Sequence, residues 1–407
     1  MSLNIDEFEK LIKPILKNGQ KYVAHSAEQL LSSGENYGSI MLRVQVKIIN
    51  ENGAEDVIEC VAKKCPPKGY LWQVFNTQET FKTEIAIYNK VVPELNKFGE
   101  ERGVNHLMNF IPNYLAARVS LDKNSNIVDE DAVLILENLK TRGYDIGNRF
   151  IGFNLECTKL VLKDLATLHA APIAYKQQKP NEFNRKILPH LGKCFVFEIS
   201  DESIENLIKL TTKSVCTNPD CMPYAARFAE NIKRINIAQM KPNISNPIFS
   251  TLTHNDYWLN NTMIKYEGGK PVANKIVDFQ INDFSSLTHD LVFFLYSSVE
   301  LPVLEKYLDE LFRLYYDNLI QTLIKLGSDT SSYTFKQMME ECGIVAKEVE
   351  LCHLIMLLPS ILKLKEKSGE LSEMNGDDFF AKEESLHENF AKRLQFILLD
   401  FVKRGWI

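Results

Sequence analysis

Four polar residues in the second half of the chain have the types and spacing of a phosphoryl-transfer site. In His254-x-Asp256, the aspartate is followed five residues later by Asn261, and Asp278 follows an apolar pair further on. A transferred phosphoryl group carries negative charge that enzymes neutralise with positioned cations, and Mg²⁺ prefers hard oxygen ligands. The carboxylate of Asp278 and the amide oxygen of Asn261 are therefore predicted metal ligands. Asp256 is predicted to face an acceptor hydroxyl, as its base or as an orienting group.

A predicted β-hairpin separates the two aspartates. Residues 263–266 form one short strand, 267–270 contains a Gly-Gly turn, and 275–277 returns toward Asp278. The alternative is that these polar residues only make turns, since Asp and Asn favour turns and His-x-Asp is common. We prefer the catalytic interpretation because the spacing, the hairpin and the apolar lead-in are three independent requirements.

The first half of the chain supplies a lysine and then a glutamate. Lys63 and Lys64 end a predicted strand, and a kinase-type phosphotransferase needs one strand lysine that points at the nucleotide phosphates. The next predicted helix, 77–92, places Glu84 among inward-facing apolar residues, where a carboxylate is costly unless it is paired. Glu84 is thus the predicted partner of the lysine. Lys63 is preferred over Lys64 because it shares the strand face of Val61; the alternative is that both are solvated strand-end charges.

Two further segments are predicted to contact a nucleotide. A glycine-containing loop at 34–39 leads into a strand, so its backbone N–H groups can approach phosphates. As a plain connection this loop would need no function. A buried-strand run at 132–139 is predicted to be the hinge between two lobes, where backbone groups can bond an adenine. The candidate residues of the two segments are Gly34, Asn36, Tyr37, Gly38, Ser39, Glu137, Asn138 and Leu139.

Composition narrows the class of protein. The 407 residues are 45% apolar and 25% charged, as in a globular protein of one large domain or two lobes. The net charge is -6 and no basic stretch is interleaved with aromatics, so nucleic acid is not an expected partner. No apolar run has membrane-spanning length and the first residues lack a signal-peptide core, so we expect a cytoplasmic protein without a membrane partner. The scattered cysteines, Cys216 and Cys221 included, are expected to be free thiols.

The rest of the chain is predicted to be mainly helical. His169 is predicted to be structural and to bond the catalytic loop from behind, and Asp290 to cap its helix or brace that loop. Only eleven residues separate Asp278 from Asp290, which leaves no room for the activation segment of protein kinases and favours a small-molecule acceptor. Aromatic residues around the site are core or pocket wall. Helical spacing predicts helices at 5–16, 155–171, 290–299, 304–326, 336–365 and 382–402, and a mixed, mostly helical region at 181–246.

These segments together resemble a known family. They are G-E-N-Y-G-S at 34–39, V-A-K-K-C-P at 61–66, F-K-T-E-I-A-I-Y at 81–88, L-E-N-L-K-T-R-G-Y at 136–144, L-A-T-L-H-A at 165–170, H-N-D-Y-W-L-N-N at 254–261 and V-D-F-Q at 277–280. In this order they are similar to the ecdysteroid-kinase-like (CHK kinase-like) family, found chiefly in insects, of the choline-kinase and aminoglycoside-phosphotransferase group.

The resemblance implies a two-lobed α+β fold of the protein-kinase type. The N-lobe, 1–137, would hold an antiparallel sheet and a helix, and the C-lobe, 138–407, would be mostly helical. The implied activity is ATP- and Mg²⁺-dependent phosphorylation of a hydroxyl on a small molecule, such as a steroid hormone or a foreign compound. By position, Asp256 would be the base and Lys63 with Glu84 the phosphate clamp.

One residue departs from the family pattern. Asn255 stands where many relatives have glycine, but asparagine tolerates a left-handed backbone better than most residues. A kinase-shaped protein that binds nucleotide or an apolar ligand without turnover is the alternative function. The presence of every polar group that catalysis requires argues against it. No surface pattern indicates a dimer.

Overall fold

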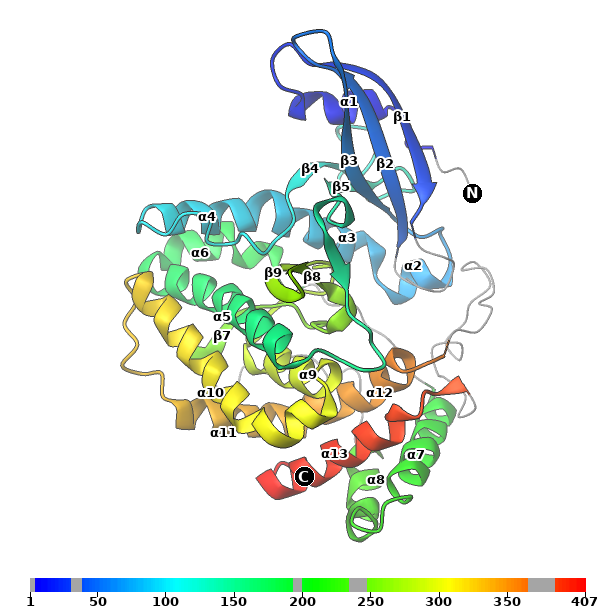
Figure 1. Cartoon of the computed structure of the whole chain (residues 1–407), viewed down its shortest axis with the longest axis vertical. Helices are drawn as coiled ribbons and strands as arrows, with labels where there is room; N and C mark the ends of the chain where they lie inside the picture. The colour runs from blue at the N-terminus through cyan, green and yellow to red at the C-terminus, as the bar shows by residue number, and fades with distance from the viewer. Residues whose placement is uncertain (1–3, 31–38, 193–199, 234–246, 365–384) are drawn as a thin grey trace.

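Alternating apolar residues fold the first part of the chain into an antiparallel sheet (Figure 1). The structure is a computed structural model that describes residues 4–30, 39–192, 200–233, 247–364 and 385–407. The described residues form five strands in this sheet, in the order β1 (Lys21–Gln29), β2 (Ile40–Ile49), β3 (Glu55–Lys64), β5 (Val133–Glu137) and β4 (Tyr114–Arg118). The sequence patterns predict β2, β3 and β5 but not β1 or β4.

One face of this sheet packs under a short first helix, α1 (Phe8–Ile12). Leu42, Val44, Val46 and Ile48 of β2 are almost fully buried, on the face that the alternation predicts. The predicted helix 5–16 is wrong in length, because α1 gives way to a 3-10 turn, Lys13–Ile15. Pro14 lies in this turn, and its ring and missing N–H disfavour a continuing α-helix.

The opposite face of the sheet meets the helical segment that carries Glu84. After α2 (Tyr70–Val74), the helix α3 (Thr77–Ala86) continues through a π-helical turn, Ile87–Val91, into α4 (Val92–Glu100). The predicted end at residue 92 is therefore wrong. Pro93 cannot donate an N–H and clashes with the preceding turn, and the wider π turn lets the helix pass it.

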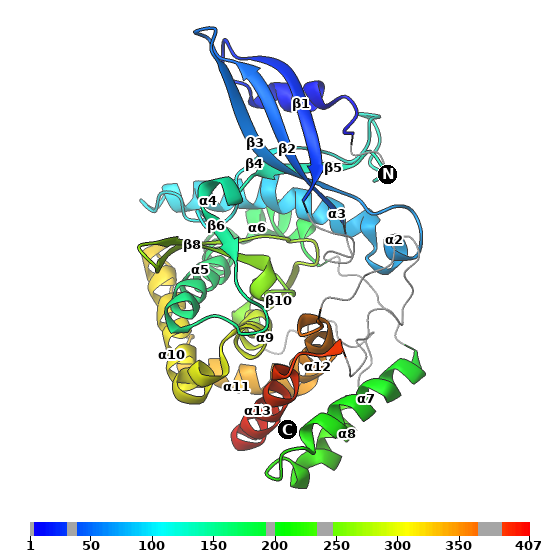
Figure 2. The ribbon, with the colours of Figure 1, turned by 45° about the vertical axis from the view of Figure 1, so that its right-hand side comes forward.

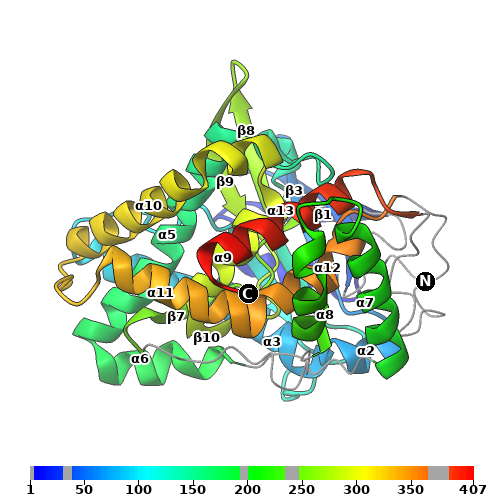
Figure 3. The same cartoon turned by 90° about the horizontal axis from the view of Figure 1, so that it is seen from below.

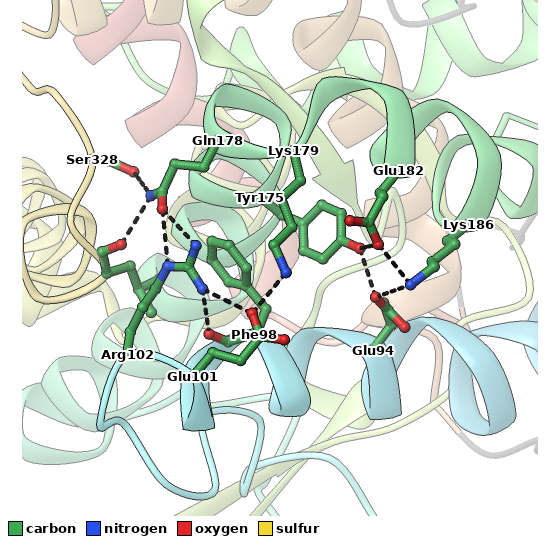
Figure 4. A network of polar contacts seen from close by, with 11 residues as sticks. Glu94, Phe98, Glu101, Arg102, Tyr175, Gln178, Lys179, Glu182, Lys186 and Ser328 are labelled. Carbon is green, nitrogen blue, oxygen red and sulfur yellow. Dashed lines mark hydrogen bonds and ion pairs between the residues drawn. The ribbon is translucent and has the colours of Figure 1, made fainter.

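A network of ion pairs and hydrogen bonds holds α4 against the C-terminal lobe (Figure 4). The hydroxyl of Tyr175 donates to Oε1 of Glu94 at 2.6 Å, and Lys186 Nζ lies 2.7 Å from the same carboxylate. At the other end of α4, the guanidinium of Arg102 donates to Oε1 of Gln178 and lies over an aromatic ring. These contacts join α4 to α5 (Leu155–Gln178) and α6 (Pro180–Lys186), so the helical segment with Glu84 is anchored to both lobes.

Two small sheets of the C-terminal lobe lie beneath the main sheet (Figures 1 and 2). In the first, β6 (Tyr144–Ile146), β8 (Thr262–Glu267) and β9 (Lys270–Ile276) pair side by side. The predicted hairpin is present, and Gly268 and Gly269 turn between β8 and β9 with φ of 58° and 77°. In the second sheet, β7 (Ser250–Thr253) pairs with β10 (Asp283–Ser286).

Helices build the rest of this lobe. The buried α9 packs against α10, α11 and α12, α7 packs on α13, and α8 packs on α12 (Figure 3). Within the described parts of the chain, no helix has the length and apolar character that a membrane crossing requires. The further helices are α7 (Asp201–Val215), α8 (Ala225–Lys233), α9 (Thr288–Ser298), α10 (Leu301–Lys325), α11 (Phe335–Val345), α12 (Leu351–Ile361) and α13 (Asn389–Arg404).

These helices broadly match the predicted ones, with shifted ends. A π-helical turn, Ala346–Glu350, divides the predicted helix 336–365 into α11 and α12. Parts of the predicted regions 181–246, 336–365 and 382–402 lie outside the described residues. A five-stranded antiparallel sheet with one helical segment, over a lobe of helices and small sheets, is the two-lobed α+β fold of the protein-kinase type that was predicted.

Candidate active site

The loop that follows β7 is held in one conformation by His254. Nε2 of His254 contacts the carbonyl oxygen of Val277 at 2.9 Å, and Nδ1 contacts the backbone N–H of Asp256 at 3.3 Å. A carbonyl can only accept and an N–H can only donate, so the imidazole carries its proton on Nε2. His254 thereby joins the loop of Asp256 to the end of the hairpin that leads to Asp278.

Asn255 adopts the left-handed backbone that the sequence comparison with glycine suggested. Its φ is 63°, and its side-chain amide donates to the carbonyl oxygen of Ile281 at 3.1 Å. Asparagine is one of the few residues that occupy this region readily, so the loop keeps its shape without glycine.

Asp290 braces the same loop from behind. Its buried carboxylate accepts the backbone N–H groups of His254 at 2.7 Å and Asn255 at 2.8 Å, and it contacts Nε2 of His169 at 3.0 Å. His169 in turn contacts the hydroxyl of Tyr315 at 2.6 Å. The predicted brace by Asp290 is present, although Asp290 lies in the first turn of α9 rather than at its cap. The ring of His169 is linked to the loop through Asp290 and does not bond it directly as predicted. Burial alone would raise the pKa of Asp290, but the bonds from His169 and His254 hold it low.

Asp256 and Asn261 contact each other directly. The side-chain amide of Asn261 donates to the carboxylate of Asp256 at 2.9 Å and to its backbone carbonyl at 2.8 Å. Burial raises the pKa of Asp256 to about 6, which suits a group that takes up a proton near neutral pH. Because both amide hydrogens of Asn261 point at Asp256, the Oδ1 atom is left as the acceptor on the other side of the group.

Lys63 lies between two carboxylates. Its Nζ is 2.7 Å from Oε2 of Glu84 and 2.7 Å from Oδ1 of Asp278, and it reaches Oε1 of Gln280 at 3.4 Å. Burial alone would lower the pKa of Lys63, but Asp278 and Glu84 overcome this and raise it. Lys64, by contrast, donates to the backbone of an N-terminal residue. The predicted pairing of Lys63 with Glu84 is present; its contact with phosphate stays a prediction.

Asp278 is the second aspartate with an unusual backbone. Its φ is 68°, in the left-handed region, which the sequence did not predict. The preceding N–H, from Val277, donates to the carbonyl oxygen of Asn261 at 3.0 Å, so the hairpin end and the Asp256 loop are joined twice. Strain of this kind is common at functional sites, where the surrounding structure fixes one side-chain direction.

The donor set fits Mg²⁺. A carboxylate at Asp278 and an amide oxygen at Asn261 are hard oxygen ligands, and Asn261 is oriented with Oδ1 available because its amide hydrogens bond Asp256. These two residues would hold the ion, and phosphate oxygens would supply further ligands. Their role as ligands stays a prediction.

The structure describes only part of the predicted nucleotide-binding segments. Gly34, Asn36, Tyr37 and Gly38 lie outside the described residues, and Ser39 is buried just before β2. The remaining three predicted residues, Glu137, Asn138 and Leu139, end β5 and start the link between the lobes.

The side chain of Glu137 forms contacts within the protein. It accepts the backbone N–H of Asn113 at 2.8 Å and pairs with Arg142 at 2.6 Å. The backbone N–H groups of Glu137 and Asn138 donate to the carbonyl oxygens of Asn113 and Glu59, whereas that of Leu139 donates to no other described residue. Backbone contact of this segment with an adenine stays a prediction, and the Leu139 N–H is the donor available for it.

Comparison with known proteins bears on this site. A model of the ecdysteroid kinase-like family matches residues 33–328. The chain belongs to this family. The matched segment spans every predicted site residue, from the glycine-containing loop to Asp278. Membership of this kinase-like family supports a phosphotransferase that acts on a small molecule.

Other comparisons are more distant. No curated protein matches this member of the ecdysteroid kinase-like family. Among solved structures, the chain is similar to the GDP complex of aminoglycoside 2'-phosphotransferase-IIIa, with 12% identity over 98% of this chain and 99% of that one and a TM-score of 0.39. It is also similar to the ADP-bound aminoglycoside phosphotransferase APH(2'')-Ib, with 13% identity over 85% and 98% of the two chains and a TM-score of 0.28.

Proposed function

We propose that the chain is an ATP- and Mg²⁺-dependent O-phosphotransferase that phosphorylates a hydroxyl group of a small molecule, an ecdysteroid-like steroid or a foreign compound. The observation that carries this proposal is the joining of Lys63, Glu84 and Asp278 to the Asp256–Asn261 pair through His254. Residues 1–137 form the nucleotide-binding lobe in this proposal, and 138–407 the lobe for catalysis and the acceptor.

Each residue then has one task. Lys63, held by Glu84, contacts the nucleotide phosphates and stabilises their negative charge. Asp256 accepts the acceptor hydroxyl proton while the acceptor oxygen forms its bond to the γ-phosphorus. The bond from that phosphorus to the bridging oxygen breaks, and ADP leaves with the electron pair. Mg²⁺, when bound by Asn261 and Asp278, neutralises charge on the phosphate oxygens.

The raised pKa of Asp256 supports its assignment as the base. Its carboxylate is buried, and a pKa of about 6 lies close enough to neutral pH for the group to be ionised before transfer and protonated by it. The bond from Asn261 fixes one carboxylate oxygen, so the other can meet the acceptor.

The test is phosphate transfer by the purified protein with ATP and Mg²⁺. Acceptors would be ecdysone, a sterol, choline and a plant phenol, with mass spectrometry to detect the added phosphate. We expect a phosphorylated alcohol, and a loss of about 10²–10⁴-fold in the Asp256→Asn variant, the usual contribution of a positioned base. Nucleotide binding should be unchanged in that variant. Undiminished transfer by Asp256→Asn would show that Asp256 is not the base.

The same experiment separates turnover from binding. Tight nucleotide binding without any product would favour the alternative of a kinase-shaped binding protein. Thermal shifts with the same four compounds would then show whether one of them is a ligand.

A further inference from the structure

A second buried cluster of titratable groups lies where α9 packs against α12 and the π-helical turn before it, and the proposed mechanism gives it no role. Glu350 ends the π-helical turn before α12 and is 2% exposed. Its Oε1 lies 2.7 Å from Nδ1 of His289, and its Oε2 lies 3.1 Å from Nδ1 of His353. No group of three His, Cys, Asp or Glu side chains among the described residues is arranged for a metal ion. The cluster is therefore a hydrogen-bonded unit of one carboxylate and two imidazoles.

The cluster is placed next to the catalytic loop by α9, which lies beside α12 (Figures 1 and 2). The ring of His353 stacks on Phe293, with centroids 4.0 Å apart and an angle of 10° between the planes. Phe293 is three residues after Asp290, and residues at this spacing share one face of a helix. Asp290 holds the backbone N–H of Asn255, which precedes Asp256. His353 thus covers the side of α9 that faces the catalytic loop.

The charges of the cluster act on the base. Burial alone would lower the pKa of His353, but Glu350 and then Asp256 and Asp290 raise it. Burial would raise the pKa of Glu350, yet His353 and His289 hold it low. His353 also opposes the burial that raises the pKa of Asp256. These interactions favour the protonated form of His353, which is paired with Glu350 and interacts electrostatically with Asp256.

One donor of His353 is available to a ligand. Nδ1 is occupied by Glu350, whereas Nε2 donates to no other residue in the described parts of the chain. The side chain is 16% exposed, so the ring is not fully enclosed by protein atoms. A fixed N–H beside a base is the arrangement that orients an alcohol.

We infer that His353, held by Glu350 and stacked on Phe293, binds the acceptor hydroxyl together with Asp256. This inference rests on the proposed function. The hydroxyl donates its hydrogen to Asp256, and its oxygen accepts the Nε2–H of His353 with one lone pair. The second lone pair forms the bond to the γ-phosphorus as the bond to the bridging oxygen breaks and the hydroxyl proton passes to Asp256. His353 keeps its own proton throughout.

The first test uses the complete protein with ecdysone as acceptor and the variants His353→Ala and His353→Gln. We expect kcat/KM for ecdysone to fall by about tenfold to a hundredfold in His353→Ala, the value of one charged hydrogen bond at the reacting group. KM for ATP should change by less than about twofold, because the nucleotide contacts lie elsewhere. His353→Gln keeps an N–H donor and should recover part of the loss.

A matched control is available in His387, whose ring also stacks on a phenylalanine, Phe150, at 4.7 Å and 17°. His387→Gln makes the same chemical change away from Asp256, so all its kinetic constants should equal those of the wild type. An equal effect of the two glutamine variants would overturn the inference.

A second test does not depend on the identity of the alcohol. ADP, Mg²⁺ and aluminium fluoride form a transition-state analogue in which water takes the place of the acceptor oxygen. Binding of aluminium fluoride to the ADP complex should weaken about tenfold or more in His353→Ala, for the same hydrogen-bond reason, with ADP binding unchanged. Equal binding in wild type and variant would overturn the role of His353. Failure of the wild type to form the complex or to transfer phosphate would instead overturn the proposed function, and the inference with it.

The dependence of phosphate transfer on pH distinguishes the proposed role of His353 from a purely structural one, which would not change this dependence. Transfer should decline at alkaline pH as His353 loses its proton, and this limb should be absent in His353→Gln. Glu350→Gln removes the charge that raises the pKa of His353, so the limb should move to lower pH. His289, Asp256 and Asp290 are the other titratable groups that face the cluster, and they are unchanged in both variants. An alkaline limb that is the same in all three proteins would contradict the inference.

Discussion

Nζ of Lys63 and Oδ1 of Asp278 lie 2.7 Å apart although the two residues are 215 positions apart in the chain. The contact joins β3 of the N-terminal lobe to the residue that follows the hairpin of the C-terminal lobe. Lys63 also compensates the charge of Glu84, which is 1% exposed. One cation therefore pairs with two carboxylates at the junction of the lobes, and both stability and metal binding should depend on it.

The first prediction concerns the contribution of the Lys63–Glu84 pair to the stability of the fold. Lys63→Met leaves Glu84 buried without its cation, which should lower the free energy of unfolding by about 3–5 kcal/mol, the usual cost of breaking a buried ion pair. Burial already raises the pKa of Glu84, so the deficit should shrink at acid pH as this carboxyl takes up a proton. Urea unfolding at pH 5 and pH 8 measures both effects.

The neighbouring lysine is the control for this change. Lys64 donates to a backbone carbonyl near the N-terminus, in an exposed contact, so Lys64→Met should change the free energy of unfolding by no more than about 0.5 kcal/mol. Equal losses in the two variants would show that the Glu84 pair does not contribute as described.

The second prediction concerns the metal. Asp278→Ala should reduce ATP affinity in the presence of Mg²⁺ by at least about tenfold, a loss that even outer-shell substitutions cause at metal sites. In EDTA, the variant should bind ATP no more weakly than the wild type, because only the metal-dependent part of binding is lost and Lys63 no longer pairs with Asp278. Isothermal titration with and without Mg²⁺ measures this. If Mg²⁺ strengthened binding as much in the variant as in the wild type, Asp278 would not be a ligand.

Local sequence patterns were sufficient to predict several features of the fold and the site. The burial of alternate residues on β2, the Gly268–Gly269 turn and the pairing of Lys63 with Glu84 each depend on period, turn chemistry or the cost of a buried carboxylate. The left-handed φ of Asn255 follows from its replacement of glycine in a tight loop. These features are set by residues close together in the chain.

Other features depend on distant contacts and gave no local signal. Both faces of β1 are largely exposed or half-buried, so its residues lack the alternation that reveals a strand. The helix that continues past Pro93 depends on a π turn, which propensity does not predict. Glu350 and His353 have helical spacing in the sequence, but the cluster that they form also requires contacts with His289, 61 positions before Glu350, and with Phe293.

The third prediction tests the brace behind the catalytic loop. In Asp290→Asn one of the N–H groups of His254 and Asn255 loses its acceptor, since an amide has a single oxygen. We expect kcat to fall by about tenfold to a hundredfold, the value of one charged hydrogen bond expressed in the transition state, with KM for ATP unchanged. The same substitution at Asp309, which is exposed and pairs with Arg404, should leave kcat unchanged. A normal kcat in a folded Asp290→Asn variant would show that the loop does not need this brace.

The fourth prediction is a pH dependence of stability centred on Asp164 of α5. Burial raises the pKa of Asp164 from its ordinary value of 3.8 to about 7, and the nearby side chain of Asn274 partly opposes this increase. The folded state therefore binds this proton more tightly than the unfolded state. Its stabilising contribution is complete below about pH 4 and is lost as the pH rises toward 7.

Asp164→Asn removes this titration, so the variant should gain stability relative to the wild type between pH 4 and pH 7, by at most about 4 kcal/mol at 1.36 kcal/mol per pKa unit. Urea unfolding at intervals of one pH unit would measure the difference. Asp317→Asn, at an exposed position of α10, should follow the wild-type curve at every pH. A constant difference between Asp164→Asn and the wild type across this range would mean that Asp164 has the same pKa in the folded and unfolded states. Any pH dependence of stability in this range would then come from another group.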